Sequence, residues 1–500
     1  MISPLLLTDR AVLQAGVEIP LLGAARPRTE VRVALAGQRA SGVADAEGRW
    51  RMTLGPFPPG GPHTLVLDRS DEASLTLRDL LVGEVWVCAG QSNMEFPLKD
   101  AEGAKEALAG SDRPRMRLFN VAHRVCDAPR ADLPGGAWEV CGPGTAASFS
   151  AVGYFFGAHL QDELGVPVGL IEAAVGATPG EAWMPLEALA ADADLRPILD
   201  RRRRSLEVYP DPQGTYEKAF AEWDRVADQA ERQGRPIPGA HPKLIGPEHP
   251  WTPAGLFNGM IAPLTSYPVR GVIWYQGEAA PERAYQYRKL FRVLIRSWRQ
   301  AWGRTEMPFL FVQAPAFGPR RSQPCEHSWA ELREAQQMAL AEANTAMAVA
   351  IDCGGEKNIH PARKKPLGDR LALAARAKAY GQEIVWSGPL FRGMAVEGSR
   401  VRLRFDHAAG GLRTSDGRPP RGFAVSGGAT DFSAGNRNFV WAQARIQGNE
   451  VLVQSPRVPM PQAVRYAWAQ NPDCNLVNAQ GLPAAPFRTD DYPGVTVANR

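Results

Sequence analysis

From Val82 to about Gly381, the chain alternates between short apolar runs and longer segments with helical periodicity. The apolar runs include GEVWVCAG, VPVGLIEAAVG, RGVIWYQGE, PFLFVQAP and TAMAVAIDCGG, and helical patterns such as AYQYRKLFRVLIRSWRQAW lie between them. Strand–helix alternation of this kind predicts a parallel sheet with helices on both faces. We therefore expect a doubly wound α/β fold over residues 81–380, with its functional site at the carboxyl ends of the strands.

The two ends of the chain have a different pattern. Residues 1–80 contain strand-like runs such as EVRVALAG and GRWRMTLG separated by proline- and glycine-rich turns, which predicts a small antiparallel sandwich. Residues 381–500 again favour strands, as in RVRLRFD and EVLVQSP. In the central region, a charged and then proline-rich segment near residues 186–250 predicts a helical insertion that ends in a loop. A chain of 500 residues is long enough for this α/β domain and two flanking β-rich modules.

Charge and hydropathy exclude several classes of partner. The chain has 57 basic and 53 acidic residues, and a net charge of +4 gives no large field to attract nucleic acid or anionic lipid. No window approaches the ~18 apolar residues of a membrane-spanning helix. The start, MISPLLLTDRAVLQ, has no signal-peptide pattern. We therefore expect a periplasmic or secreted protein if a signal peptide has been removed, and a cytoplasmic protein otherwise; the oligomeric state is left open.

The six cysteines show no Cys-x-x-Cys pair and no spacing typical of a metal site. We therefore expect neither a metal ion nor another cofactor. Cys126 and Cys141 could form a disulfide, but nothing in the sequence requires one, so the pairing stays open.

Polar residues follow four of the predicted strands. Ser92, in GQSNM, follows the first strand and is either a turn serine or a nucleophile presented at a helix N-terminus. Gly176 follows the second strand, where it either makes a tight turn or offers an N–H group to an oxyanion. Gln276 and Glu278 follow the third strand, and either face solvent or supply an oxyanion donor and a carboxylate that orients a histidine. His360, on a loop after the fourth strand, is a surface residue or a general base. Together these residues supply the groups needed for acyl transfer.

The motifs also resemble a known family. GEVWVCAGQSNMEFPL, VPVGLIEAAVGATPGEAW, LFNGMIAPL, GVIWYQGEAA and NIHPARKKPLGDRLALAA are similar, in this order, to the motifs of sialate O-acetylesterases. These enzymes belong to the SGNH hydrolases, within the larger set of carbohydrate esterases. The resemblance covers nearly the whole chain and implies an SGNH-hydrolase-like fold and a metal-independent serine esterase that acts on O-acetylated glycans.

The resemblance implies a role for each matching residue. Ser92 corresponds to the nucleophile and His360 to the base. Gly176 and Gln276 correspond to positions that form the oxyanion hole together with the Ser92 N–H group, and Glu278 corresponds to a glutamate that orients the histidine. Two residues beside the motifs are expected to contact substrate, Gln91 next to the nucleophile and Trp183 after the second block, although Trp183 is equally well explained as a core residue.

The chain departs from the family pattern at three positions. Lys357 stands where many SGNH hydrolases have an aspartate three residues before the histidine, so the third member of the triad is Glu278, with Asp352 as the reserve, or is absent. Asn358 replaces an aspartate in the DIHP pattern, and Ala177 replaces the second glycine of Gly-Gly-Thr. The predicted activity is that of a carbohydrate O-acetylesterase, similar to the sialate O-acetylesterases, that hydrolyses acetyl esters on sugars, with xyloglucan or xylan fragments as alternative substrates. An inactive carbohydrate-binding protein is the alternative of a different class.

Overall fold

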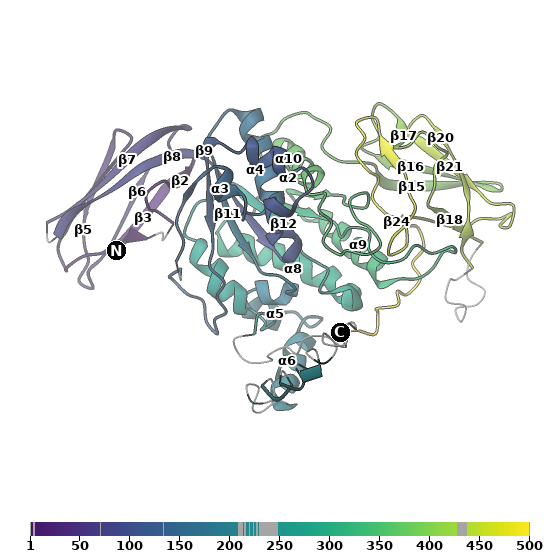
Figure 1. Ribbon diagram of the computed structural model, residues 1–500, viewed down its shortest axis with the longest axis horizontal. Helices are drawn as coiled ribbons and strands as arrows, with labels where there is room; N and C mark the ends of the chain where they lie inside the picture. Colours follow the sequence, from purple (N-terminus) through teal and green to yellow (C-terminus); the bar gives the residue numbers. More distant parts are fainter. Residues whose placement is uncertain are drawn as a thin grey trace.

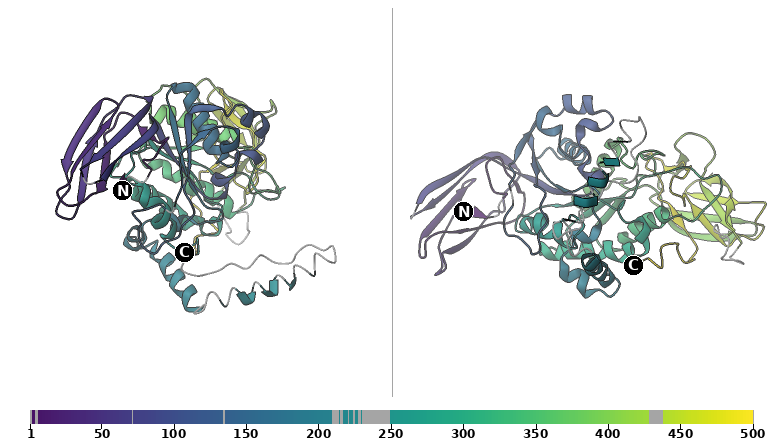
Figure 2. Two further views of the ribbon diagram at one scale, coloured as in Figure 1. Left: turned by 60° about the vertical axis from the view of Figure 1, so that its left-hand side comes forward. Right: turned by 60° about the horizontal axis from the view of Figure 1, so that its bottom comes forward.

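The structure is a computed structural model that describes residues 2–3, 6–70, 72–133, 135–208, 249–427 and 438–499, together with scattered residues between 214 and 229. Figure 1 shows a central part of helices around a sheet, with the N-terminal strands on one side and the C-terminal strands on the other. The rotated views in Figure 2 show the same arrangement. The chain is therefore a mixed α/β fold with further β-rich parts at its two ends.

The central sheet has the strand order β10-β9-β11-β8-β12-β13-β14. Neighbouring strands from β9 to β14 run parallel, as expected, because helices connect them. The edge strand β10 is antiparallel to β9, so the expectation of a fully parallel sheet is wrong at this edge and the sheet is mixed. The strands are β8 (Glu72–Gly90), β9 (Arg113–Asn120), β10 (Glu139–Cys141), β11 (Val168–Ala174), β12 (Gly271–Tyr275), β13 (Phe309–Val312) and β14 (Thr345–Ala348).

Helices cover both faces of this sheet, because its strands are apolar on both sides. On one face, α4 and α10 pack over Trp86 and Cys88 of β8. On the other face, α8 and α9 pack over Trp274 and Phe309. The helices are α1 (Ser92–Glu95), α2 (Ala104–Ala109), α3 (Pro143–Ala146), α4 (Ala151–Leu164), α5 (Leu186–Ala191), α6 (Arg196–Val208), α8 (Ala284–Ala301), α9 (Ser328–Met338) and α10 (Lys365–Lys378).

The register of the three central strands brings their carboxyl ends to one level. Gly90 at the end of β8 pairs with Ala174 of β11 on one side and with Tyr275 of β12 on the other. The residues that follow these three strands therefore emerge side by side at one edge of the sheet. This is the edge at which open α/β sheets bind their ligands.

The N-terminal strands are continuous with the central sheet through the long strand β8. The first half of β8 pairs with β7 and β2, and its second half lies between β11 and β12. A boundary at residue 80 thus falls within a strand, and the domain limits taken from the sequence stay predictions. The remaining N-terminal strands are β1 (Ile2–Ser3), β2 (Val12–Gln14), β3 (Ile19–Ala24), β4 (Glu30–Leu35), β5 (Gln38–Val43), β6 (Arg49–Leu54) and β7 (Gly60–Arg69).

The C-terminal strands form sheets of their own beside α9. The buried guanidinium of Arg333 in α9 donates hydrogen bonds to the carbonyl oxygens of Ala469 and Gln470, each of 2.7 Å, and so ties this part to the centre. The strands are β15 (Leu390–Glu397), β16 (Arg400–Asp406), β17 (Leu412–Thr414), β18 (Phe423–Ser426), β19 (Val440–Trp441), β20 (Gln443–Gln447), β21 (Glu450–Gln454), β22 (Ala463–Tyr466), β23 (Leu476–Asn478) and β24 (Phe487–Arg488).

Two further expectations concern the insertion and the cysteines. The helices α5 and α6 form the first part of the predicted insertion, whereas most of residues 209–248 lies outside the described residues. Cys126 and Cys141 are both free thiols, so the disulfide that the sequence left open is not formed here.

Candidate active site

Ser92 is the first residue of α1, two residues after the end of β8. The turn between them requires glycine at position 90, where φ is +145° and a Cβ atom would lie 2.1 Å from the carbonyl oxygen of Tyr275. The chain therefore leaves the sheet abruptly and presents Ser92 above the strand ends, where its side chain remains partly exposed.

His360 lies against Ser92. The distance between Ser92 Oγ and His360 Nε2 is 2.8 Å, and the backbone N–H of His360 donates a hydrogen bond of 2.8 Å to Asn358 Oδ1. Burial lowers the pKa of His360, and the nearby charge of Lys364 lowers it further. The imidazole is therefore mostly neutral at neutral pH, the state in which a ring nitrogen can accept a proton from a serine hydroxyl.

Gly176 also faces Ser92. A Cβ atom on Gly176 would lie 3.6 Å from Ser92 Cβ and 3.2 Å from Glu95 Oε2. The Ser92 N–H has no acceptor within its own helix because Ser92 is the first helical residue. Among the described residues, neither this N–H nor that of Gly176 donates a hydrogen bond to another group. Three of the residues singled out from the sequence, Ser92, Gly176 and His360, thus lie together.

The side chain of Gln276, which is expected to bind an oxyanion, forms its hydrogen bonds with the turn after β11 and with α8. The side chain is fully buried, and its Nε2 donates to the Thr178 carbonyl at 3.2 Å while its Oε1 accepts from the Tyr287 hydroxyl at 2.7 Å. Its amide thus fastens the turn that contains Gly176 to α8. The physical reason is that a residue directly after a strand can point to either side of the sheet edge.

The two residues that are expected to contact substrate, Gln91 and Trp183, are both buried. Gln91 is buried, and its Oε1 accepts hydrogen bonds of 3.3 Å from the N–H groups of Gly277 and Ala279, so it holds the loop after β12. Trp183 has no exposed surface; its indole N–H donates to Thr178 Oγ1 at 3.0 Å and its ring packs edge-on against Trp274. Of the two interpretations of Trp183, the core residue is the one found.

Glu278 contacts Asn93 rather than His360. Asn93 Nδ2 donates to Glu278 Oε1 at 2.6 Å and to the carbonyl oxygen of Ile359 at 3.0 Å, next to His360 in the chain. In the described part of the chain, no carboxylate forms a hydrogen bond or an ion pair with the His360 ring. Among the described residues, hydrogen bonds connect Glu278 to the histidine through Asn93 and the backbone of Ile359.

Lys364 completes this buried group of polar side chains. It has no exposed surface, its ammonium donates a hydrogen bond to Asn93 Oδ1, and it lies 4.6 Å from the centre of the Phe96 ring. Burial lowers the pKa of Lys364 to about 7, with Glu278 acting in the opposite direction. Burial likewise raises the pKa of Glu278, and the hydrogen bond from Asn93 and the charge of Lys364 oppose this shift.

Asp352, the second candidate for the third triad position, binds Arg370. Its two carboxylate oxygens each accept a hydrogen bond of 2.7 Å from Arg370 of α10. Although burial acts to raise it, the pKa of Asp352 stays below its ordinary value because of this guanidinium. The pair fastens the first part of the loop after β14 to α10.

Sequence reasoning missed two residue pairs near Ser92. Asn93 and Lys364 were not singled out, because Asn93 follows the serine as an ordinary helix residue and Lys364 lies in the cationic run ARKKP, which is typical of an exposed surface. Glu95 and His123 form an ion pair of 3.2 Å beside Gly176, and the hydrogen bond to Glu95 raises the pKa of His123. No sequence signal connected these two positions.

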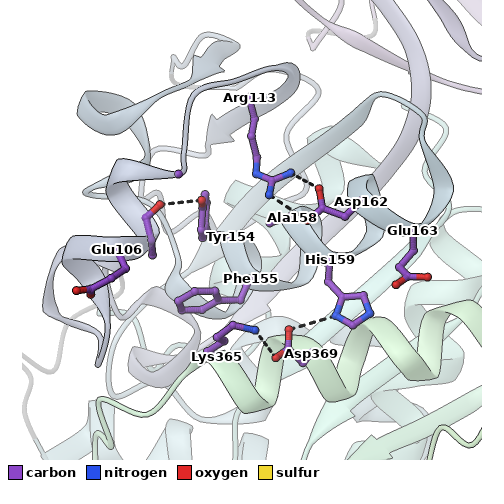
Figure 3. Close-up of a pocket in the computed structure, with 12 residues that line it drawn as sticks. Glu106, Arg113, Tyr154, Phe155, Ala158, His159, Asp162, Glu163, Lys365 and Asp369 are labelled. Carbon is purple, nitrogen blue, oxygen red and sulfur yellow. Dashed lines mark hydrogen bonds and ion pairs between the residues drawn. The ribbon is translucent and has the colours of Figure 1, made fainter.

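Other features of the described residues do not belong to this site. A cavity of about 320 Å³ lies between α2, α4 and α10, where Figure 3 shows Lys365 and His159 pointing at Asp369; neither Ser92 nor His360 lines it. Within the described ranges, no cluster of metal-ligating side chains occurs. In the same part of the chain, no helix is long and apolar enough to cross a membrane.

A serine and a neutral histidine in hydrogen-bond contact, above the carboxyl ends of an α/β sheet, define the class of serine hydrolases. The chain matches the family described as "Carbohydrate esterase, sialic acid-specific acetylesterase" over residues 249–377. It is 30% identical to the sialate O-acetylesterase of Rattus norvegicus, over 90% of this chain and 86% of the relative, and 28% identical to that of Homo sapiens, over 89% and 83%.

A solved structure agrees with these sequence relatives. The crystal structure of a carbohydrate acetylesterase from Xanthomonas citri has a TM-score of 0.81 and 35% identity, and the match covers 98% of this chain and 99% of that one. The chain belongs to the sialate O-acetylesterase family. The prediction of a carbohydrate O-acetylesterase is thereby confirmed.

Proposed function

We propose that Ser92 is the nucleophile and His360 the general base of this esterase, in a catalytic unit of SGNH-hydrolase type formed by residues 81–380. The single observation that carries the proposal is the 2.8 Å contact between Ser92 Oγ and His360 Nε2. The hydroxyl attacks the acetyl carbonyl while Nε2 takes its proton, and the protonated ring then gives this proton to the departing sugar oxygen. Water, activated by the same ring, releases acetate from the acetyl-serine.

The N–H groups of Ser92 and Gly176 are the proposed oxyanion donors. Their position beside Ser92 Oγ and the lack of any other acceptor in the described residues support this role. Gln276 contributes by fastening the turn that contains Gly176.

The proposed third part of the catalytic machinery is the buried array of Glu278, Asn93 and Lys364. It takes the place of a carboxylate that would accept a hydrogen bond from the His360 ring. Asn93 binds the carbonyl oxygen of Ile359 and thereby fixes the backbone next to His360. Glu278 accepts a hydrogen bond from Asn93 Nδ2, and Lys364 donates one to Asn93 Oδ1. Together they hold the Asn93 amide in one orientation. In this arrangement Glu278 positions His360 without touching it.

The test is acetate release by the Ser92→Ala variant, with Ser297→Ala as the matched control. Ser297 is a buried serine of α8 whose hydroxyl donates to Leu294 O at 2.8 Å, remote from the strand ends. Loss of the nucleophile is expected to lower kcat by several orders of magnitude, whereas the control keeps its activity. Near-normal turnover by a folded Ser92→Ala variant would exclude the proposal, and a wild-type protein inactive on 4-nitrophenyl acetate would favour a binding protein.

The sialic acid substrate of the named relatives is the first candidate for this chain, with O-acetylated xyloglucan and xylan fragments as the alternatives. Acetate release from a panel that contains 9-O-acetyl-N-acetylneuraminic acid and acetylated oligosaccharides of both plant polysaccharides distinguishes them by kcat/KM.

A further inference from the structure

Trp251 is an exposed tryptophan beside the active site. Its side chain is one of the few large hydrophobic groups left at the surface of the described residues, with 43% of the residue exposed. The indole N–H donates a hydrogen bond of 2.6 Å to the carbonyl oxygen of Ala177, and the His249 ring lies edge-on to the indole with 5.8 Å between ring centres. The ring is therefore held in place although much of it faces solvent.

The hydrogen bond places this ring at the proposed oxyanion turn. Ala177 follows Gly176, whose Cβ position would lie 3.6 Å from Ser92 Cβ, and consecutive Cα atoms are only about 3.8 Å apart. Ala177 has φ of +57°, so its backbone conformation is fixed in the left-handed region. The exposed indole is therefore fastened, through the Ala177 carbonyl, to the turn whose Gly176 lies beside Ser92.

A fixed, exposed indole is suited to one kind of ligand. A pyranose ring has a face of C–H groups that loses contact with water when it packs on an aromatic plane, while its hydroxyl groups stay hydrated at the ring edge. Glu95 and His123 form an ion pair beside Gly176, and both side chains can exchange hydrogen bonds with such hydroxyls. The turn of Gly176 and Ala177 thus has both an apolar plane and polar side chains next to it.

We propose that Trp251 is the platform on which the sugar ring of the acetylated substrate stacks, so that its acetyl ester reaches Ser92. This inference rests on the proposed function of Ser92 and His360 and adds the residue that recognises the sugar. It assigns to Trp251 the role that the sequence had suggested for Trp183. It also implies that small acetyl esters without a sugar do not contact Trp251, so that their hydrolysis depends on Ser92 and His360 alone.

The chain offers a closely matched control. Trp441 is exposed to 42%, and its indole N–H also donates to a backbone carbonyl, that of Ser322, at 2.8 Å. It lies in the C-terminal strands, and no hydrogen bond or ring contact connects it to Ser92 in the described residues. Replacing Trp441 therefore removes the same kind of side chain and hydrogen bond at a position outside the active site.

The experiment measures kcat/KM for Trp251→Ala, Trp251→Phe and Trp441→Ala on two substrates. One is the acetylated sugar with the highest kcat/KM in the panel above, and the other is ethyl acetate. We expect Trp251→Ala to lower kcat/KM on the sugar by about 10- to 100-fold, the size expected for a lost aromatic contact, and on ethyl acetate by less than about 2-fold. Trp251→Phe keeps an apolar plane and should recover part of the loss, and Trp441→Ala should match the wild type on both substrates.

The other outcomes overturn the inference. An equal loss on both substrates, with Phe no better than Ala, would mean that Trp251 only braces the Ala177 carbonyl. No loss on the sugar, a similar loss for Trp441→Ala, or a wild type that prefers ethyl acetate to every sugar of the panel would exclude a sugar platform. Failure of the proposed function is distinguishable from all of these, because then Ser92→Ala would retain activity on ethyl acetate.

Discussion

Asn93 Nδ2 donates a hydrogen bond of 2.6 Å to Glu278 Oε1, and this contact occupies the carboxylate that the sequence had assigned to the histidine ring. The same nitrogen binds the carbonyl oxygen of Ile359, directly before His360. The other oxygen of Glu278 is buried and has no hydrogen-bond partner among the described residues. Among the described residues, no carboxylate binds the second nitrogen of the His360 ring, and the hydrogen bond from Asn93 to the carbonyl oxygen of Ile359 holds the backbone next to it.

The first prediction compares the two acidic residues that competed for the third triad position. Glu278→Gln removes the charge that faces Lys364 but keeps an oxygen that can accept from Asn93, so we expect kcat on an acetyl ester to fall by about 10- to 100-fold, as for other indirect supports of a reactive group. Asp352→Asn should change kcat by less than ~10-fold. It should instead lower the free energy of unfolding by about 1.5–3 kcal/mol, because it weakens the bidentate contact with Arg370.

Rate assays on both variants, together with urea denaturation, check this comparison. A loss of ~10⁴-fold for Glu278→Gln would indicate a direct contact with the ring during turnover, as in a conventional triad. If Asp352→Asn were the inactive variant and remained folded, Asp352 would take the role. If neither variant lost activity, Ser92 and His360 would act as a dyad that needs no acidic support.

The second prediction concerns the pH dependence of catalysis. His360 must be neutral to accept the Ser92 proton, so kcat/KM rises with pH through the pKa of His360, which burial and the charge of Lys364 hold below its ordinary value. Lys364→Met removes that charge, the protonated ring becomes more stable, and the acidic limb of the profile should move to higher pH. The pKa of Lys364 of about 7 means that its charge is mostly present in the pH range of this limb.

Lys365→Met is the matched control for this experiment. Lys365 is the next residue, but its side chain is exposed and binds Asp369 at 2.6 Å, away from Asn93. Its pH profile of kcat/KM should coincide with that of the wild type. A Lys364→Met profile that is lower at every pH but has the same acidic midpoint would mean that Lys364 supports Asn93 without acting on the titration of His360.

The positions of the site residues could be predicted from the sequence, whereas the directions of several side chains could not. The sequence predicts that Ser92, Gly176 and His360 lie close together, because the carboxyl ends of parallel strands are at one edge of a sheet. Gln276 and Glu278 were placed at the same edge correctly, but whether a side chain there points to the serine or into the protein depends on neighbours that are distant in sequence, such as Tyr287 and Asn93.

The local sequence pattern is also misleading where the burial of a residue differs from what is typical of its type. Lys364 is a lysine in a cationic run, which is typical of an exposed surface, yet it is completely buried because Asn93 and two aromatic rings surround its ammonium. Trp251 follows a charged, proline-rich segment in which no periodicity marked it, and only the fold brings it to Ala177. The continuous strand β8 likewise joins two parts that the sequence had separated at residue 80.

A third prediction is that metal chelation leaves the activity unchanged. The proposed reaction uses a serine, a neutral histidine and backbone N–H groups, and no step of it requires a Lewis acid. Incubation with EDTA followed by dialysis should leave kcat on an acetyl ester within about 2-fold of the untreated enzyme. Lost turnover that returns on addition of a divalent cation, but not of buffer alone, would show that the mechanism is incomplete.

The last prediction concerns Glu172, a buried carboxyl group in β11 beneath the site. Burial raises the pKa of Glu172 to about 8, from an ordinary value of 4.5, even though Glu172 Oε2 accepts a hydrogen bond of 2.9 Å from the N–H of Ser150. Between these two pKa values the folded protein holds a proton that the unfolded chain has lost. The free energy of unfolding therefore falls as pH rises from about 4.5 to 8, with a limiting slope of about 1.4 kcal/mol per pH unit from this group.

Glu172→Gln should remove this contribution, because the amide has a similar shape, still accepts the hydrogen bond from Ser150 and does not titrate. We expect the variant to gain stability relative to the wild type as pH rises from 5 to 8, while the two proteins are most similar near pH 5. Urea denaturation at several pH values checks this, with Glu163→Gln as the control, since Glu163 is a more exposed acid of α4 that binds Arg376. Equal pH dependence in the wild type and Glu172→Gln would mean that Glu172 is ionised in the folded protein, with its charge stabilised by Ser150 and the strand ends around it.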